Sequence, residues 1–431
     1  METYGKVLMV ASPIFLLLVI AEALIIHFKG KTQMRLMDVI SSLSSGMTNS
    51  VKDVLGLSVS IISYPFLLEK FAFFSIENTF LTYIIVFIVL DFKGYWVHRW
   101  SHKINFFWNK HAIHHSSEDF NLACALRQSV SYFVNIFTFF FIPAAILGVP
   151  AQVVAVVAPL HLFSQFWYHT ELIGKMGFME HIIVTPSHHR VHHAVNQEYM
   201  DKNLSEVFIV WDKFFGTFQE ELPNIPTVYG ISRPAQTWNP IKINFQHLFL
   251  LIADAWRTKN VADKFRIWWK PTGWRPADVE AAYPVSKIED VYSYQKYEPK
   301  TSLALKIWSL FQLITLFGIV TLFYGTVSKI GFPNMLYYGV FIFASVYSFT
   351  ELMDKNPKAL LYEILKNAFG LYLVYRLGSW FNIDEYMPYG THLMLTYFLI
   401  STLAVAYFVL RSGDFTTQTL ANSSLKSNTQ F

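Results

Sequence analysis

Long apolar blocks are the feature that most constrains the fold of this chain. Hydrophobic residues make up 53% of its 431 residues, charged residues only 15%, and the apolar ones come in runs rather than in periodic stripes. A run of about 18 apolar residues can cross a bilayer as one helix. The segments predicted to span are Val7–Phe28, Val54–Leu68, Phe80–Val97, Val130–Leu147, Ala151–Tyr168, Leu303–Tyr324, Met335–Phe349, His392–Leu410 and, as the weakest candidate, Leu360–Leu377. The predicted fold class is an all-α integral membrane protein with about nine transmembrane helices.

Two of these segments need a comment. The first run is too long for the core of a signal peptide and has no small-residue cleavage site, so it is predicted to be a retained helix. The segment Leu360–Leu377 carries Glu363 and Lys366, which are three residues apart and could pair on one helix face.

The distribution of lysine and arginine predicts the orientation of the chain. Basic residues gather in the loop after the first apolar run, at Lys29, Lys31, Arg35 and Lys52, and the opposite loops are poor in them. Because cytoplasmic loops carry the excess of positive charge, the N-terminus is predicted to lie outside. The net charge of +4 fits this bias and needs no nucleic-acid partner. The host membrane would be the endoplasmic reticulum in a eukaryote or the inner membrane in a bacterium.

Hydropathy divides the chain near residue 300. Residues 1–79 are predicted as N-terminal transmembrane helices and residues 80–220 as a catalytic core. Residues 221–302 read as a cytosolic and interfacial segment, because Phe245–Trp256 is amphipathic and tryptophans there lie among basic residues. Residues 303–412 are predicted as C-terminal transmembrane helices. Residues 413–431 form a polar tail, predicted to be disordered over Thr416–Phe431.

Histidines carry the chemistry of the predicted core. Eight of the fifteen lie in three clusters with the spacings HxxxH, HxxHH and HxxHH. Residues three and four apart share a helix face, so each cluster aims its imidazoles at one point. Eight neutral imidazoles saturate two first-row metal ions with about four nitrogens each. The predicted ligands, at the cytoplasmic ends of the helices, are His98, His102, His111, His114, His115, His189, His192 and His193.

The type of ligand narrows the reaction. Catalytic zinc sites need only three protein ligands, and soluble di-iron bundles use glutamates that do not accompany these clusters. The single cysteine, Cys124, excludes a cysteine-ligated iron–sulfur cluster and is predicted to be a packing residue. An all-imidazole pair of iron ions facing lipid suits activation of O2 and oxidation of a C–H bond. The chain has no nucleotide-binding fingerprint, so its electrons are expected from a soluble reductant or a partner.

Further residues are candidates for the site. His169 and His161 end the predicted helix Ala151–Tyr168 and are candidate additional ligands, whereas His188 is not expected to bind metal. A carboxylate or amide can orient a metal-bound imidazole through its second nitrogen. The candidates for this role are Asp91, Asp119 and Asn203, followed by Glu118, Asn121 and Asp201. Arg127 and Gln128 are candidates for contact with a headgroup or an anionic cofactor, with a membrane anchor as the alternative for Arg127.

Five stretches of the core resemble the fatty acid hydroxylase and sterol desaturase superfamily. They are HRWSH at His98–His102, Lys110–Ser129, FWYHTE at Phe166–Glu171, TPSHHRVHH at Thr185–His193 and WDKFFGTF at Trp211–Phe218. Within it they are similar to the subgroup that oxidises glyceryl ether lipids. The resemblance implies a non-haem di-iron monooxygenase that hydroxylates the carbon beside the ether oxygen of an alkylglycerol, with tetrahydrobiopterin as the reductant.

Other interpretations stay open at this stage. The same superfamily includes hydroxylases and desaturases of fatty acyl chains, sterols and carotenoids. A histidine-rich metal transporter is an alternative of a different class, but transporters need ionisable ligands along a pathway through the membrane. A dead oxygenase retained as a scaffold is a third, and the intact clusters argue against it.

Overall fold

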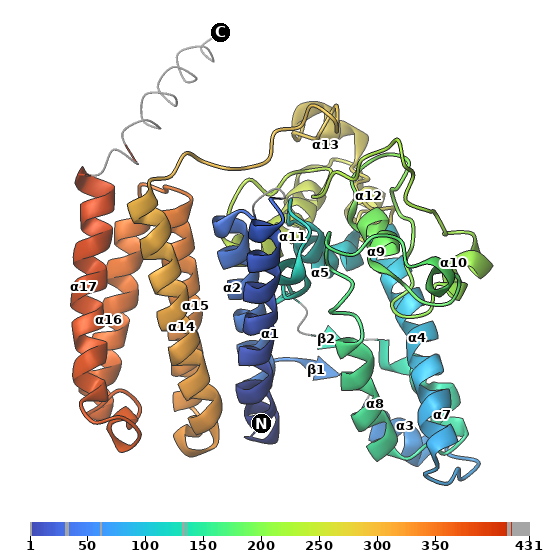
Figure 1. Cartoon of the computed structure of the whole chain (residues 1–431), viewed down its shortest axis with the longest axis horizontal. Helices are drawn as coiled ribbons and strands as arrows, with labels where there is room; N and C mark the ends of the chain where they lie inside the picture. The colour runs from blue at the N-terminus through green and yellow to red at the C-terminus, as the bar shows by residue number, and fades with distance from the viewer. Residues whose placement is uncertain are drawn as a thin grey trace.

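The computed structural model of the chain describes residues 2–30, 34–60, 63–131, 134–135, 137–411 and 415. Within these residues the regular elements are helices, together with one pair of two-residue strands (Figure 1). The elements are α1 (Glu2–Phe28), α2 (Leu36–Val54), β1 (Val59–Ser60), α3 (Tyr64–Phe71), α4 (Phe80–Lys103), α5 (Asn105–His115), α6 (Leu122–Ala125), β2 (Val134–Asn135), η1 (Phe137–Phe141), α7 (Ile142–Ile146), α8 (Ala151–Phe163), η2 (Gly177–His181), α9 (Pro186–His193), α10 (Val210–Phe215), α11 (Pro240–Arg257), α12 (Val261–Arg266), α13 (Ala277–Ala282), α14 (Leu303–Ile330), α15 (Asn334–Met353), α16 (Ala359–Leu377), η3 (Ile383–Glu385) and α17 (Gly390–Arg411).

Membrane-spanning helices are fewer than the apolar runs predicted. Within the described residues, five helices are long and apolar enough to cross a bilayer, namely α1, α4, α14, α15 and α17. The predicted segment Leu360–Leu377 is helical as α16, but Glu363, Lys366 and Arg376 keep it out of that set. The prediction of about nine spans is therefore not confirmed.

Two predicted spans are not single helices. In Val54–Leu68, α2 ends and Gly56 turns the chain at a φ of 68°, after which Pro65 opens α3. In Val130–Leu147 the described residues form β2, η1 and α7. The two short strands pair in parallel, with Val59 opposite Val134. In the part of the chain that the structure describes, neither run forms a helix long enough to be counted among the candidate spans.

The predicted span Ala151–Tyr168 is also shorter than expected. Helix α8 ends at Phe163, after 13 residues, and covers only about 20 Å. The chain then turns, with the Ser164 hydroxyl donating to the His161 carbonyl at 2.6 Å. This early end directs the residues that follow toward the core instead of along a helix axis.

The helices form two groups with α1 and α2 between them (Figure 1). Helices α14 to α17 pack as a bundle in which each contacts the next along the chain, and α1 and α2 both contact α14. On the other side α4 packs against α8 and against α5. The histidine-bearing helices α5 and α9 lie at the end of the molecule opposite the N-terminus (Figure 1). The assignment of that end to the cytoplasm stays a prediction.

Helix α2 was missing from the sequence prediction because serines and charges dilute its hydropathy. It buries Asp38 and a row of serines against its neighbours. Gly46 allows this close approach, because a Cβ there would lie 2.8 Å from the carbonyl oxygen of Leu126. Small residues of this kind let helices approach closely, so α2 ties the bundle to the core.

The remaining sequence predictions concern the C-terminal half. The expected pairing in α16 is confirmed, since Lys366 Nζ donates to Glu363 Oε1 at 2.7 Å and both side chains are buried. The amphipathic segment Phe245–Trp256 lies within α11, which packs against α5. The polar tail at 416–431 lies outside the described residues.

Candidate metal centre

Helix α9 presents the third histidine cluster from a capped and fixed start. Pro186 occupies its first position, and the Thr185 side chain and the His188 ring form a reciprocal capping box. The Thr185 backbone N–H donates to His188 Nδ1 at 3.4 Å. His188 therefore caps the helix, whereas His189, His192 and His193 belong to the groups of imidazoles described next.

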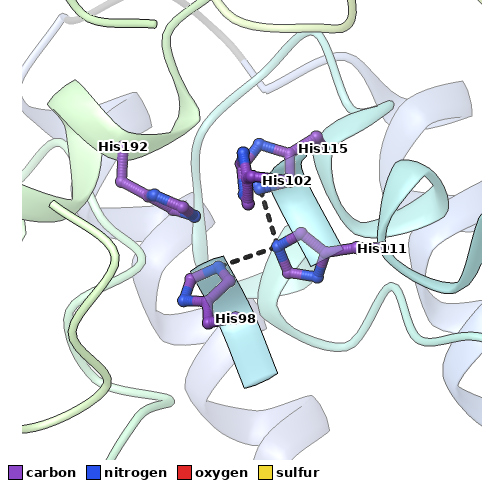
Figure 2. A group of neighbouring side chains, drawn as sticks. All are labelled: His98, His102, His111, His115 and His192. Carbon is purple, nitrogen blue, oxygen red and sulfur yellow. Dashed lines mark hydrogen bonds between the residues drawn. The ribbon is translucent and has the colours of Figure 1, made fainter. Parts of the chain in front are cut away.

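The structure brings nine imidazoles together in two groups. In each group the ring nitrogens that could bind a metal lie within 4.8 Å of one another. The first group, drawn in Figure 2, is His98, His102, His111, His115 and His192; the second is His114, His169, His189 and His193. All eight residues predicted from the clusters are included, and His169, a candidate from the sequence, completes the second group.

The first group surrounds one shared space. Figure 2 shows the five rings turned toward one another, from α4, α5 and α9. His111 Nε2 lies 2.8 Å from His98 Nε2 and 2.9 Å from His115 Nε2. The Nε2 atoms of His102 and His192 are buried without a hydrogen-bond partner among the described residues.

The second group is built in the same way from α5, α9 and the turn after α8. His189 Nε2 lies 2.8 Å from His169 Nε2 and 3.0 Å from His193 Nε2. His169 Nε2 lies 3.4 Å from His114 Nε2. The two groups adjoin, because the rings of His115 and His193 stack with centroids 4.4 Å apart.

Carbonyl oxygens orient four of the nine rings through Nδ1. In the first group, His98 Nδ1 lies 2.8 Å from the Leu204 oxygen and His192 Nδ1 lies 3.1 Å from the Lys202 oxygen. In the second, His114 Nδ1 lies 3.3 Å from the Arg127 oxygen and His169 Nδ1 lies 3.0 Å from the Gln165 oxygen. A carbonyl can only accept, so Nδ1 carries the proton and Nε2 presents a lone pair to the centre of its group.

The protonation of the rings fits the binding of cations. Burial, together with repulsion between neighbouring imidazoles, lowers the pKa of His111, His115 and His193 well below the usual histidine value. Burial lowers the pKa of His114 to about 4. Neutral rings with converging lone pairs repel one another unless a cation lies between them. The donor set, all imidazole nitrogen, suits first-row transition metals such as iron, copper or zinc.

The predicted orienting residues are placed differently from expectation. The Asp91 carboxylate accepts from the backbone N–H groups of Val207 and Phe208 and pairs with His161 Nε2 at 2.9 Å. Asp119 pairs with Arg35 at 2.9 Å and with Lys296 at 2.8 Å.

Asn203 also contacts no imidazole ring. Its amide donates to the His188 and Gln219 carbonyls, at 3.0 and 2.7 Å, and so holds the backbone of α9. The carboxylate that does reach a box histidine is Asp201, with Oδ1 3.3 Å from His102 Nδ1. Hydrogen bonds from His102 and Lys103 outweigh burial and lower the pKa of Asp201 to about 2.

Two further candidates are corrected by their contacts. His161 lies outside both groups, and its Nε2 pairs with Asp91 at 2.9 Å. The Arg127 guanidinium is buried and pairs with Asp38 of α2 at 3.0 Å. A buried arginine paired in this way holds the backbone carbonyl that orients His114.

Two acidic residues that support the second group were not among the predicted site residues. Asp38 of α2 fixes Arg127, as described above. Glu22 of α1 accepts from the Thr170 hydroxyl at 2.5 Å, next to His169, and from the Leu122 backbone N–H at 2.6 Å. Buried acids within apolar or serine-rich helices are the one sequence pattern that could have identified them.

A large apolar cavity opens onto both groups. Its volume is about 1410 Å³, and α1, α2, α8 and α14 supply most of its walls. His98, His111 and His114, which are only half-buried, form part of its lining together with His169 and His189. A cavity of this size and character has room for a long alkyl chain with one end against the imidazoles.

The chain is similar to a known protein family and to known enzymes. The model of the family described as "Fatty acid hydroxylase" matches residues 83–217. The chain is 34% identical to alkylglycerol monooxygenase of Homo sapiens over 93% of its own length and 88% of that protein. It is 32% identical to alkylglycerol monooxygenase of Xenopus tropicalis, over 84% of its length and 81% of that protein.

A more distant relative covers only part of the chain. Ornithine lipid hydroxylase OlsE of Rhizobium tropici is 27% identical over 34% of this chain and 44% of its own length. No solved structure matches the chain.

Proposed function

The chain belongs to the fatty acid hydroxylase family, and on that premise we propose that it is a di-iron monooxygenase that hydroxylates an ether lipid within the membrane. The family and the relatives support the broader statement, a lipid hydroxylase of the monooxygenase class in an integral membrane protein. The metal, the substrate and the side of the membrane belong to the proposal. The positive-inside bias supports a centre on the cytoplasmic side.

One observation carries the proposal: two adjoining groups of neutral imidazoles stand at one end of an apolar cavity of about 1410 Å³. Two metals held by nitrogen alone can bind O2, and an apolar cavity beside them admits a lipid chain. A hydrolytic zinc site would use fewer ligands and would leave half of the rings without a role.

Different residues of the chain would bind the metals, orient the imidazole rings and hold the substrate. The Nε2 atoms of the nine imidazoles would hold two iron ions, which supply the activation of O2 when bound. The carbonyls of Leu204, Lys202, Arg127 and Gln165 keep four of these rings in one tautomer. The apolar walls hold the alkyl chain and exclude water, so that the oxidising equivalent is directed at the C–H bond rather than lost to solvent.

The substrate proposed first is a glyceryl ether, hydroxylated at the carbon beside the ether oxygen, which leads to cleavage of the ether. The relatives named alkylglycerol monooxygenase, similar over most of the chain, support this choice. Tetrahydrobiopterin is the proposed external reductant. The similarity of the core to an ornithine lipid hydroxylase supports a second candidate, hydroxylation of a fatty acyl chain.

The decisive experiment combines metal analysis with an oxygen assay on detergent-purified protein. We expect two iron ions per chain and pterin-dependent O2 uptake that requires a 1-O-alkylglycerol. Product analysis by mass spectrometry should show a fatty aldehyde and glycerol. A hydroxylated acyl chain, formed from an ornithine lipid in the same assay, would instead support the second candidate.

The variant His114→Ala tests the metal centre directly, because it removes a proposed ligand but leaves the membrane helices unchanged. It should insert normally and show no turnover. Normal turnover by this variant would overturn the proposal, and so would metal uptake into vesicles without any consumption of oxygen.

A further inference from the structure

The cavity has a polar cluster at its histidine end. Lys110, Gln165 and Glu206 line the cavity but belong to neither histidine group. Each is close to the groups through the chain itself. Lys110 directly precedes His111, the Gln165 carbonyl orients His169, and Glu206 lies two residues after Leu204, whose carbonyl orients His98. We name these three residues the polar cluster.

Two members of the polar cluster, Gln165 and Glu206, contact each other and the buried His161. Gln165 Nε2 donates to Glu206 Oε2 at 3.2 Å, and the same oxygen lies 3.6 Å from His161 Nδ1. About 24% of the Glu206 side chain stays exposed, on the wall of the cavity. The Lys110 ammonium lies 4.5 Å from the centre of the Phe137 ring.

Gly94 of α4 makes the position of the carboxylate possible. A Cβ at Gly94 would lie 2.1 Å from Glu206 Oε2, which is inside van der Waals contact. The carboxylate therefore rests against the backbone of a membrane-spanning helix. A side chain at position 94 would displace the carboxylate without removing its charge.

Polar groups in an apolar cavity are costly unless they are hydrogen-bonded. Burial raises the pKa of Glu206, and nearby positive charge, from His161 first and then from lysines that include Lys110, offsets this only in part. A ligand hydroxyl can donate to a carboxylate and accept from an ammonium at the same time. A phosphate head, in contrast, would bring negative charge against Glu206.

We infer that Lys110, Gln165 and Glu206 bind the uncharged, hydroxyl-bearing head of the lipid substrate, with its alkyl chain along the apolar part of the cavity. This inference rests on the proposed function for the reaction itself. Because the polar cluster adjoins the imidazoles, the oxidised carbon lies within a few bonds of the head. A lipid hydroxylated far along its chain would need its head at the other end of the cavity.

Equilibrium binding to purified protein tests the inference independently of turnover. The probes are a radiolabelled 1-O-hexadecylglycerol, the same lipid with a phosphate in place of one hydroxyl, and hexadecane. Glu206→Leu should weaken binding of the glyceryl ether by about 10- to 100-fold, as expected for a lost hydrogen bond to a charged group. It should leave the binding of hexadecane unchanged and improve that of the phosphate lipid.

Two more variants keep the result interpretable. Gly94→Ala keeps the carboxylate but displaces it, and should shift head selectivity in the same direction as Glu206→Leu. Glu220→Gln, at an exposed acid on the protein surface, should bind all three probes as the native protein does. Metal content and the thermal midpoint identify any variant that fails to fold.

The outcomes separate this inference from the proposed function. Equal weakening of all three probes by Glu206→Leu, or no weakening of the glyceryl ether by either Glu206→Leu or Gly94→Ala, would overturn the head site, even if the native protein oxidises ether lipids. Head selectivity that depends on Glu206 in a protein without monooxygenase activity would support the site and contradict the proposed function.

Discussion

The two histidine groups use the same chemistry but are supported by different parts of the chain. The first group takes its orienting contacts from one short segment, through Asp201, the Lys202 carbonyl and the Leu204 carbonyl. The second depends on the Arg127 carbonyl and the turn at Gln165 to Thr170, which α2 and α1 hold through Asp38 and Glu22. The N-terminal helices are therefore part of the centre as well as of the membrane region.

The largest expected effect comes from two adjacent residues of α9 that point into different groups. His192→Ala and His193→Ala should each lower activity by more than ~100-fold, because loss of a ligand exceeds the effect of losing an orienting partner. Iron analysis should show that each variant retains the metal of the other group. Loss of both metals from both variants would show that the groups act as a single centre.

A change in α2 should damage the second group alone. Asp38→Asn removes the charge that pairs with the buried Arg127 guanidinium, and breaking such a pair costs about 3–5 kcal/mol. We expect a lower thermal midpoint and loss of the metal near His114, with the first group still loaded. Asp38→Asn combined with Arg127→Met removes both charges and should recover part of the stability. Equal loss of metal from both groups would contradict the idea that Asp38 supports the second group alone.

The matching change for the first group is milder. Asp201→Asn keeps a hydrogen-bond acceptor near His102 but removes the charge, so the metal affinity of that group should fall by about 10- to 100-fold. Asp201 is partly exposed, and the thermal midpoint should hardly change. Competition with a chelator measures the affinity. If Asp201→Asn lowered the thermal midpoint as much as Asp38→Asn does, the two groups would not differ in how their supporting residues contribute to stability.

The smallest effect is a shared dependence on pH. His247 of α11 contacts the Asn105 carbonyl at the start of α5, the helix that serves both groups, and burial lowers its pKa from 6.5 to about 4. The unfolded chain binds this proton below pH 6.5 and the folded chain only below about 4, so stability should fall as the pH drops through that window. His247→Gln should reduce the dependence of the thermal midpoint on pH between pH 6.5 and 4. An unchanged slope would show that other groups dominate the acid response.

Much of the centre could be predicted because its geometry is local. The HxxxH and HxxHH spacings fix which rings share a helix face, and all eight predicted residues enter the two groups. The same spacing argument was extended to Asp91, seven residues before His98, and there it did not identify the partner. The Asp91 carboxylate is engaged by His161 of α8 and by the 207–211 segment.

Apolar runs were a weaker guide than histidine spacing. Hydropathy identifies apolar segments, but it does not say whether they are buried in lipid or inside the protein. Val54–Leu68 and Val130–Leu147 are broken by turns and strands, whereas the serine-rich α2 is a buried helix that hydropathy missed.

The helical membrane character, the all-imidazole donor set and the family could be predicted from the amino-acid sequence, because they depend on composition and on residues a few positions apart. The division into groups of five and four, their separate supports and the polar end of the cavity became visible in the folded chain. These features join residues as distant as Glu22 and Thr170, which are 148 positions apart. No local spacing encodes such contacts, because they form only when packing brings the helices together.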